Sequence, residues 1–386
     1  MPIAGLRGTG SFSADERPKN YRGMLLLLKP NTRAPLTALT GQMKSESTDD
    51  AEFKVFTKGL PSQRATVSGS INTTVTSITL QGSGNHTLFK TGHAVINERT
   101  GEVMWVSSAA TANTIITERG KGSSKAAMTT GDGLLILGSH HEEGAATPAA
   151  ITYDPSVVTN YTQIFRNSLN LTGTALATRL RYADNRKLEA KREVLELHAI
   201  EMEKQFFFGS GVEDTTGSHP ERTTKGLFFF ITSNVSDAAD AMDIDSFENF
   251  LEDVFEDGSD QKMLYCGNRQ LNVINKAARI WGTLQTMPKT ETFGMQIQEW
   301  ITPYGSLAIR QHPLFSKNPT FNDWGFVLDN TSIVYRYLRG RDTQYLTNRH
   351  SPGDDVEKDE YLTECGLECQ FQETHGLLKN ASAFVP

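Results

Sequence analysis

One stretch, from Gly173 to Phe208, constrains what this chain can fold into more than any other. Apolar residues recur along it at helical spacing: Leu176, Leu180, Ala183, Leu188, Leu195, Ala199, Met202 and Phe206. No further glycine and no proline interrupts the run, Thr172 or Thr174 is placed to cap its start, and Gly209 follows its end. The pattern predicts a single long helix, about 50 Å in length at 1.5 Å per residue.

The other faces of this predicted helix are charged, and several opposite charges stand three or four residues apart. These pairs are Arg186 with Glu189, Glu189 with Arg192, Arg192 with Glu196, and Glu201 with Lys204. Each pair stabilises a helix by only a few tenths of a kcal/mol. Because the helix is longer than a small domain is wide, more than one neighbouring element has to cover its apolar stripe. We therefore expect a plate-like subunit built on a spine helix.

Composition and charge narrow the possible partners. A chain of 386 residues is long enough for two or three domains, and an apolar content of 38% suits a loop-rich protein. The net charge of -7 argues against nucleic-acid binding over the whole surface. The charge is uneven, since six basic and two acidic residues fall within 1–35, whereas ten acidic residues and no Lys or Arg fall within 226–261.

Neither a membrane segment nor a disulfide framework is predicted. The longest apolar run near the N-terminus, Met24–Leu28, is too short to span a bilayer or to form the core of a signal peptide. The chain has three cysteines, Cys266, Cys365 and Cys369, which are too few for a fold held together by several disulfides. They are consistent with synthesis in a reducing cytoplasm.

The first part of the chain predicts an arm followed by a β-rich excursion. Residues 1–50 show no sustained period and are interpreted as an extended arm or a disordered terminus, with one or two helical turns from Leu36. Glu52–Thr57 is predicted to be a strand. Short apolar runs separated by turn signals across 66–145 are typical of a small β-barrel or sandwich. Ile151–Leu171 is again predicted to be extended.

The second half predicts a mixture of helices and strands, which is an α+β pattern. After a polar loop, Lys225–Ile231 is expected to re-enter a core. Asp245 and Glu248 resemble a capping box that opens an amphipathic helix. The other predicted elements are a helix at Asn268–Trp281 and strands at Met263–Cys266, Phe293–Thr302, Gly305–His312, Gly325–Leu328, Ser332–Leu338 and Cys365–Gln372.

Two candidate metal motifs do not have the required spacing. His140 to Glu143 begins like a zinc-protease motif but lacks the second histidine, so a polar loop is predicted there. Cys365 and Cys369 alternate with polar residues on a predicted strand, which places them about 13 Å apart. That distance is too long for a disulfide or a shared zinc ion, so both are predicted to lie on the buried face of the strand.

The remaining candidate segments also have simpler interpretations. Arg119–Lys125 lacks the spacing of a phosphate-binding loop and is predicted to be a mobile hairpin tip. The acidic run 237–260 lacks the pattern of a calcium loop and is interpreted as a solvated helix face or as a contact for the basic arm. We therefore assign no catalytic, cofactor-binding or metal residues.

Five stretches and their order carry a resemblance to a known family. They are Asn31–Phe56, Thr100–Met104, Asn160–Arg166, Glu201–Gly209 and Thr302–Leu314. Together with the order of arm, strand-rich excursion and charged spine helix, they resemble the major capsid proteins of tailed bacteriophages. Those proteins have the HK97-type capsid fold, and the chain is similar to the branch with a β-rich insertion in its extended loop. The resemblance covers most of the chain, although its motifs are diffuse.

The resemblance implies an α+β capsid fold with a role for each region. The implied regions are an N-terminal arm at 1–50, an extended loop at 51–172 with an inserted β-domain at about 66–145, a spine helix and following loop of the peripheral domain at 173–225, a mainly axial domain at 226–300, and strands returning to both domains at 301–386.

The resemblance also implies a function, which is self-assembly without catalysis. Copies of the chain would form the hexamers and pentamers of an icosahedral shell around double-stranded DNA, in the virion after assembly in the host cytoplasm. Implied partners are other copies, a separate scaffolding protein, a portal and a decoration protein, with nonspecific DNA contact, no membrane and no cofactor. No Lys–Asn crosslink pair is assigned. The alternatives are another virion component, such as a decoration or tail protein, and an enzyme with a scattered active site.

Overall fold

The computed structural model describes residues 34–40, 44–59, 62–82, 84–109, 113–145, 147, 153–178, 186–281, 290–292 and 295–385. The chain divides into two compact units, one formed by Met1–Val55 with Val157–Pro386 and the other by Phe56–Ser156. Most of the predicted arm, residues 1–33, lies outside the described residues.

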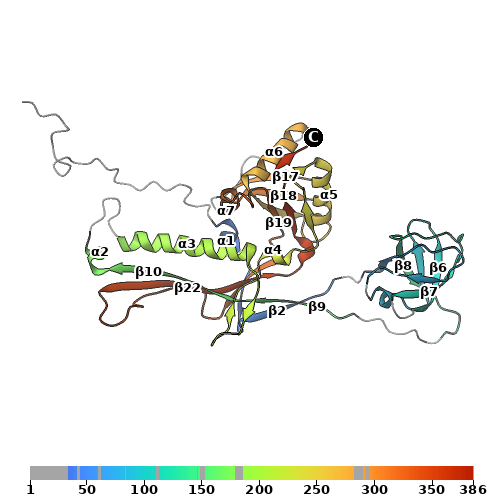
Figure 1. The fold of residues 1–386 in the computed structure, drawn as a ribbon, viewed down its shortest axis with the longest axis horizontal. Coiled ribbons are helices and arrows are strands. Elements are labelled where there is room, and N and C mark those ends of the chain that lie inside the picture. Colours follow the sequence, from blue (N-terminus) through green and yellow to red (C-terminus); the bar gives the residue numbers. More distant parts are fainter. Residues whose placement is uncertain are drawn as a thin grey trace, which may run out of the picture. The chain divides into compact units, whose positions relative to one another are not determined.

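Two sheets and one long helix form the framework of the larger unit (Figure 1). Its helices are α1 (Pro35–Thr40), α2 (Gly173–Ala177), α3 (Arg186–Phe208), α4 (Leu227–Phe230), α5 (Ile244–Phe255), α6 (Asn268–Trp281), α7 (Pro313–Lys317) and the 3-10 helix η3 (Gln372–Thr374). Its strands are β1 (Ser45–Thr48), β10 (Gln163–Thr172), β11 (Glu213–Asp214), β12 (Glu221–Arg222), β13 (Val235–Asp237), β14 (Ala241–Met242), β15 (Gln261–Cys266), β16 (Thr290–Thr292), β17 (Met295–Ile301), β18 (Ser306–Gln311), β19 (Gly325–Leu328), β20 (Ile333–Leu338), β21 (Gln344–Leu346), β22 (Val356–Cys369), β23 (Gly376–Lys379) and β24 (Ala383–Phe384).

The first sheet supports the long helix. Its strands run in the order β1-β20-β22-β10, and β21 also pairs with β22. β10 and β22 are antiparallel over ten residue pairs, from Gln163 opposite Cys365 to Thr172 opposite Val356. Helix α3 packs along these two strands (Figure 1).

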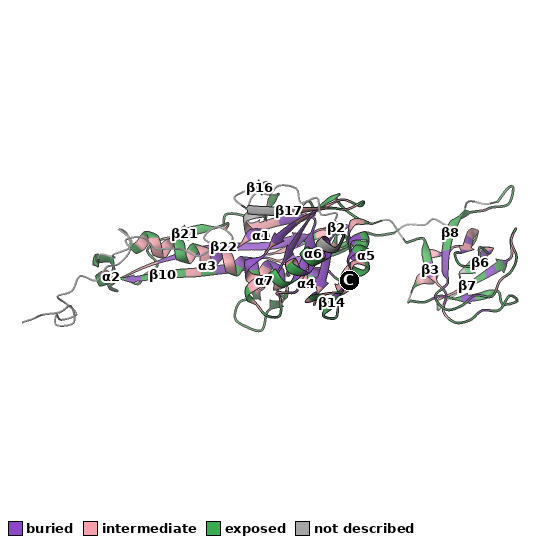
Figure 2. Ribbon diagram, turned by 90° about the horizontal axis from the view of Figure 1, so that it is seen from above, coloured by how far each residue is buried: buried purple, intermediate pink, exposed green. Residues whose placement is uncertain are grey.

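The second sheet has seven strands in the order β13-β23-β19-β15-β18-β17-β16. Its central strand, β15, alternates between two hydrophobic cores. Met263 and Tyr265 pack with the C-terminal end of α3, whereas Leu264 and Cys266 pack with α5 and α6. Figure 2 shows buried residues concentrated in these strands. The strand predicted at 263–266 is confirmed and begins two residues earlier, at Gln261. Its Met263–Cys266 part has no polar face because the sheet is covered on both sides.

The prediction of one unbroken helix from Gly173 is wrong at its start. Thr172 caps α2 as predicted, since its side chain accepts a hydrogen bond from the Ala175 amide. However, α2 ends at Ala177 because Thr178 adopts an extended backbone conformation. The long helix is α3, and at 1.5 Å per residue it is about 35 Å long rather than about 50 Å. The predicted stripe residues Leu180 and Ala183 lie outside the described residues.

Two further local predictions need correction. Helix α5 is capped by Asp243, whose carboxylate accepts a hydrogen bond from the Ser246 amide at 2.8 Å, so Asp245 lies in the first turn and is not the cap. Strand β22 begins at Val356, well before the predicted Cys365, because it pairs with β10 along its whole first part. The predicted bounds of α6 and β19, in contrast, are confirmed.

The smaller unit is a β-structure. Its elements are β3 (Arg64–Thr66), β4 (Ser77–Thr79), the 3-10 helix η2 (Asn85–Leu88), β5 (His93–Asn97), β6 (Val103–Ala109), β7 (Thr114–Arg119) and β8 (Gly133–Ser139). They form one six-stranded sheet in the order β3-β8-β5-β6-β7-β4. The two ends of this sheet are joined, since the Ser68 amide donates to Thr79 O and the Gln81 amide donates to Thr66 O, both at 2.8 Å.

A two-stranded ribbon lies where the chain passes between the two units. It consists of β2 (Glu52–Thr57), whose predicted bounds are confirmed, and β9 (Ser156–Tyr161). Among the described residues, no helix is long and apolar enough to cross a membrane.

A buried histidine beside the seven-stranded sheet makes stability depend on pH. The Asp329 amide donates a hydrogen bond to Nδ1 of His375 at 3.1 Å. Burial lowers the pKa of His375 to about 4, from an ordinary value near 6.5. Between these values the unfolded chain binds the proton and the folded chain does not, so the free energy of unfolding falls as pH falls through this window.

We expect His375 to reduce the free energy of unfolding by about 3 kcal/mol between pH 6.5 and pH 4. Urea denaturation of the wild type and of His375→Gln across this range measures the effect. The variant should show a shallower pH dependence. Part of the dependence should remain, because burial also lowers the pKa of His198. Equal slopes for the two proteins would contradict the assignment.

Candidate functional site

The described residues hold no group of three or more His, Cys, Asp or Glu side chains placed to bind a metal ion. The segment from His140 to Glu143 is a loop that follows β8, as predicted. Cys365 and Cys369 are free and buried, as predicted, and burial raises the pKa of each thiol to about 12. Protonated thiols are poor nucleophiles, so the features that bear on function are surfaces and the contacts that position them.

Helix α3 holds α1, the first described element of the N-terminal arm. The buried carboxylate of Glu203 accepts hydrogen bonds from the amides of Leu36 and Thr37, at 2.7 and 2.6 Å. These amides belong to the first turn of α1, where a side-chain oxygen replaces the missing intrahelical acceptor. Nε2 of buried His312 donates to the same carboxylate at 2.8 Å. The point where residues 1–33 join the folded unit is therefore fixed to the spine helix.

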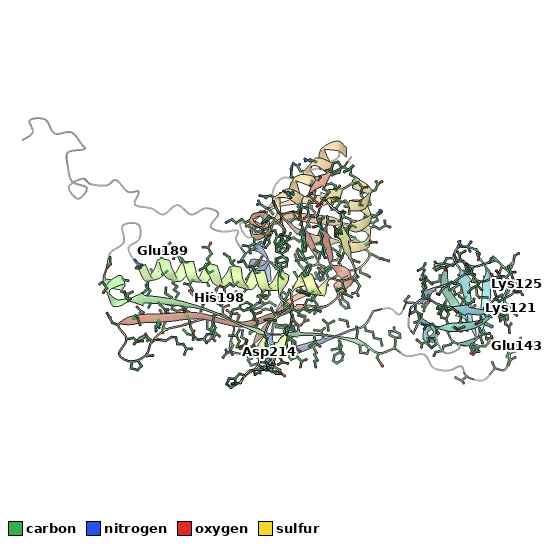
Figure 3. The ribbon with its side chains drawn as sticks, in the orientation of Figure 1. Lys121, Lys125, Glu143, Glu189, His198 and Asp214 are labelled. Carbon is green, nitrogen blue, oxygen red and sulfur yellow. The ribbon has the colours of Figure 1, made fainter. Side chains whose placement is uncertain are left out.

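The N-terminal half of α3 is attached by charge rather than by apolar burial. Nζ of Lys187 lies 3.1 Å from the buried carboxylate of Asp359 on β22, and Nζ of Lys191 lies 3.7 Å from the ring centroid of Tyr345. Burial alone would raise the pKa of Asp359, but hydrogen bonds from Tyr345 and Lys187 outweigh it and lower the pKa. His198, midway along the helix, bonds to Asn167 of β10 (Figure 3).

As a result, the predicted apolar stripe is buried only in its C-terminal half. Met202 and Phe206 lie in the core as predicted. Leu188 and Leu195, which were predicted to be covered, are 58% and 43% exposed, and nearby Leu197 is 56% exposed. One of the predicted surface ion pairs, Glu189 with Arg192, is present at 4.0 Å (Figure 3 labels Glu189).

Strand β22 carries a row of buried carboxylates. Glu364 and Glu368 are buried, whereas Phe371, just after the strand, is 40% exposed. Cations from neighbouring elements cover the row: Arg166 contacts Glu360, Arg341 contacts Glu364, and Arg336 contacts Glu368. Pairing with arginine reduces the free-energy cost of burying these carboxylates. Both faces of the strand can therefore be covered. Arginines at 166, 336 and 341 lie far from the strand in sequence, so no local signal indicated them.

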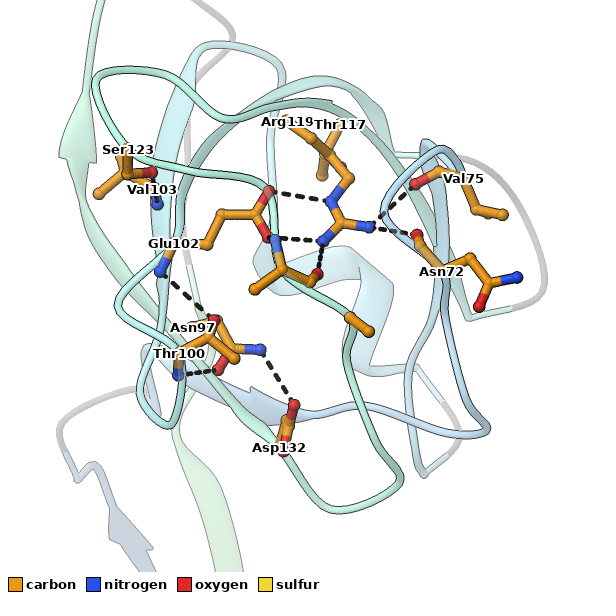
Figure 4. A network of polar contacts seen from close by, with 12 residues as sticks. Asn72, Val75, Asn97, Thr100, Glu102, Val103, Thr117, Arg119, Ser123 and Asp132 are labelled. Atoms are coloured by element: carbon orange, nitrogen blue, oxygen red, sulfur yellow. Dashed lines mark hydrogen bonds and ion pairs between the residues drawn. The ribbon is translucent and has the colours of Figure 1, made fainter.

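The smaller unit is organised around a buried ion pair (Figure 4). The Arg119 guanidinium donates to both carboxylate oxygens of Glu102, at 3.0 and 2.5 Å, and both side chains are almost fully buried. Arg119 also donates to the Asn72 carbonyl at 2.6 Å and to the Ala126 carbonyl, so one side chain joins two loops to the sheet. The prediction of Arg119 as part of a mobile hairpin tip is therefore wrong, because this residue is a buried crosslink.

A second polar contact lies beside it. The Arg99 guanidinium donates to the Asp132 carboxylate at 2.6 and 2.8 Å, and the Asn97 amide side chain donates to it at 3.2 Å. The hydrogen bond from Arg99 is the main reason that the pKa of Asp132 is well below its usual range. The strand ends and turns of this unit are thus fixed by charge as well as by its apolar core.

Comparisons with known proteins agree on one family. A sequence profile described as SU10 major capsid protein matches residues 7–382. The major capsid protein of Pseudomonas phage PaMx41 is 27% identical over 352 residues, which cover 88% of this chain and 84% of that protein.

Solved structures also match this chain over most of its length. The capsid of a native GTA particle is 10% identical, covers 98% of this chain and 100% of that chain, and has a TM-score of 0.49. A structure from Microbacterium phage Oxtober96 is 8% identical, covers 94% of this chain and 96% of that chain, and has a TM-score of 0.48.

Proposed function

Because this chain belongs to the SU10 major capsid protein family, we propose that its copies associate through the exposed half of α3 and through the β2–β9 ribbon. The chain is a structural, non-enzymatic major capsid protein with the HK97-type fold; it forms the shell of a tailed phage and is located in the virion. The function predicted from the sequence is confirmed by the family match. The surfaces that carry assembly are our proposal.

The exposed leucines of α3 are the observation that carries this proposal. Leu188 and Leu195, seven residues apart and therefore on one side of α3, leave apolar area in water on an otherwise charged helix, whereas Leu197 lies on the opposite side. An apolar patch with a charged surround resembles the core and rim of a protein interface. Lys187 and Lys191 bind the helix to its own sheet, so the leucines are not needed to hold the subunit together.

The ribbon offers a second surface of the same kind. An isolated two-stranded ribbon is marginally stable in water and is stabilised when a partner covers it. Phe56 on β2 is 72% exposed, and Val157 on β9 is also exposed. Contacts that are individually weak become stable when closed symmetry repeats them around a shell.

The proposal also assigns a role to each region of the chain. We assign 1–50 to an arm, 51–172 to an extended loop, 173–225 to the peripheral domain, 226–300 mainly to the axial domain, and 301–386 to strands of both. The joined edges of the six-stranded sheet support a closed β-barrel inserted in the extended loop.

The partners follow from the same assignment. We propose that the copies form hexamers and pentamers of an icosahedral shell, and that a separate scaffolding protein, a portal and a decoration protein associate with it. The acidic surface of the chain as a whole supports only nonspecific contact with packaged DNA.

Replacing Leu188 and Leu195 together with glutamate tests the α3 surface. Both side chains are substantially exposed, so we expect the free energy of unfolding to change by less than about 1 kcal/mol. Assembly should fall at least tenfold, because like charges would replace apolar contacts between copies. Electron microscopy and sedimentation of the variant measure this loss.

The matched control is Val212→Glu, which places one such charge at a comparably exposed apolar residue in the loop after α3. It should fold and assemble as the wild type does. Normal shells from the α3 variant would overturn the proposed surface without affecting the family assignment.

A further inference from the structure

The larger unit contains an aromatic groove that its own described residues leave unfilled. Its volume is about 470 Å³, within the range of about 300–1,000 Å³ that encloses small ligands. Seven Phe and Trp side chains line it, and we call the cavity that they form the aromatic groove: Phe207, Phe208, Phe228, Phe229, Phe315, Phe321 and Trp324. They come from the end of α3, from α4 and from α7 with the loop that follows it.

The aromatic rings support one another and form a rigid wall. Phe208 stacks on Phe321 with centroids 4.4 Å apart, and Phe228 stacks on Trp324 at 5.6 Å. Phe229 is 44% exposed and lies at the rim. A preformed apolar groove of this kind fits branched aliphatic side chains, because little ordering is required when they bind.

The N-terminal arm joins the folded unit beside this groove. Glu203, which binds the amides of Leu36 and Thr37, precedes the groove residue Lys204 in α3. His312 donates to Glu203 and also lines the groove. Leu36 and Thr37 of the arm are therefore linked to the groove through a single residue, Glu203.

The arm contains one segment of matching chemistry within reach. Met24–Leu28 is five consecutive apolar residues and is the longest such run in residues 1–33. Seven residues lie between Leu28 and Leu36, and the eight steps of extended chain from one to the other span up to about 28 Å. A short tether of this kind gives an effective concentration of about millimolar, which favours the chain's own segment over one from another copy.

We propose that the aromatic groove binds the chain's own Met24–Leu28, so that the arm is latched to its own subunit before assembly. The proposal concerns a single chain, so it can fail without affecting the assembly surfaces proposed above, and they can fail without affecting it.

Disulfide trapping in the full chain tests this latch. Leu26→Cys combined with Phe229→Cys places one thiol in the segment and one at the rim, while the three native cysteines are buried. Mild oxidation of dilute protein should give a disulfide within one chain, at least tenfold faster than the control pair Leu26→Cys with Val212→Cys. Non-reducing electrophoresis and mass spectrometry of the linked peptides identify the product.

Other outcomes would overturn the proposal. Disulfide-linked dimers would show that the groove binds the Met24–Leu28 segment of a second copy. Equal rates of disulfide formation for the trapping pair and the control pair would show that the groove binds this segment from neither copy. Adding Leu25→Asp and Leu27→Asp to the trapping pair should reduce the rate to that of the control. These substitutions lie outside the described core, so an unchanged rate would show that apolar contact does not hold the segment.

Discussion

Replacing Glu203 with alanine is expected to lower the free energy of unfolding by about 3–5 kcal/mol and to release the N-terminal end of α1 from α3. The substitution leaves two amides without their acceptor, at Leu36 and Thr37, and removes the partner of buried His312. Each buried donor without a partner costs about 1–3 kcal/mol. Urea denaturation measures the loss, and hydrogen exchange at the two amides should increase strongly.

The matched control for this experiment is Glu201→Ala on the same helix. Glu201 is exposed and, within the described part of the chain, accepts an exposed hydrogen bond from Asn167, so its removal should change stability little. Unchanged exchange at Leu36 and Thr37 in Glu203→Ala would show that another contact fixes α1. Since α1 is the first described element of the arm, we also expect Glu203→Ala to assemble poorly.

Replacing Arg119 with methionine should destabilise the smaller unit by about 3–5 kcal/mol. The change leaves the Glu102 carboxylate buried without its cation, which is the costly way to break a buried ion pair. It also releases the carbonyls of Asn72 and Ala126 that Arg119 holds. Hydrogen exchange across β5 to β8 measures the effect, and α3 should keep its protection if the two units unfold independently.

Two variants separate this effect from a simple loss of charge. Arg119→Met with Glu102→Met should recover much of the lost stability, since no unpaired charge remains buried. Arg64→Met removes an ion pair with Glu98 that lies at the surface, and it should change stability little. Equal destabilisation by Arg119→Met and Arg64→Met would contradict the role assigned to the buried pair.

Elements whose signals are local could be predicted from the sequence. The bounds of α6, β2 and β19 follow from periods and turn residues within the element itself, and the family resemblance rests on the order of such elements. The helix break at Thr178 could not be predicted in this way, because the sequence continues an acceptable helical pattern there.

Contacts between residues that are far apart in the sequence could not be predicted from local sequence patterns. A carboxylate such as Glu203 or Glu364 appears as surface charge when its sequence neighbours are charged. It becomes a buried anchor only when His312, α1 or Arg341 is brought to it by the fold. The same holds for Arg119 and Glu102, which are 17 residues apart and meet across two strands.

The chain's own pattern thus determined its class: a charged spine helix, a strand-rich excursion and a core of alternating helices and strands. These follow from the spacing of apolar residues, which sets the face that each element buries. Only the tertiary structure decided which leucines of α3 stay exposed, which carboxylates are buried, and where the aromatic groove lies. Those outcomes depend on partners from other elements, since the cost of burying a charge or exposing a leucine is set by what packs against it.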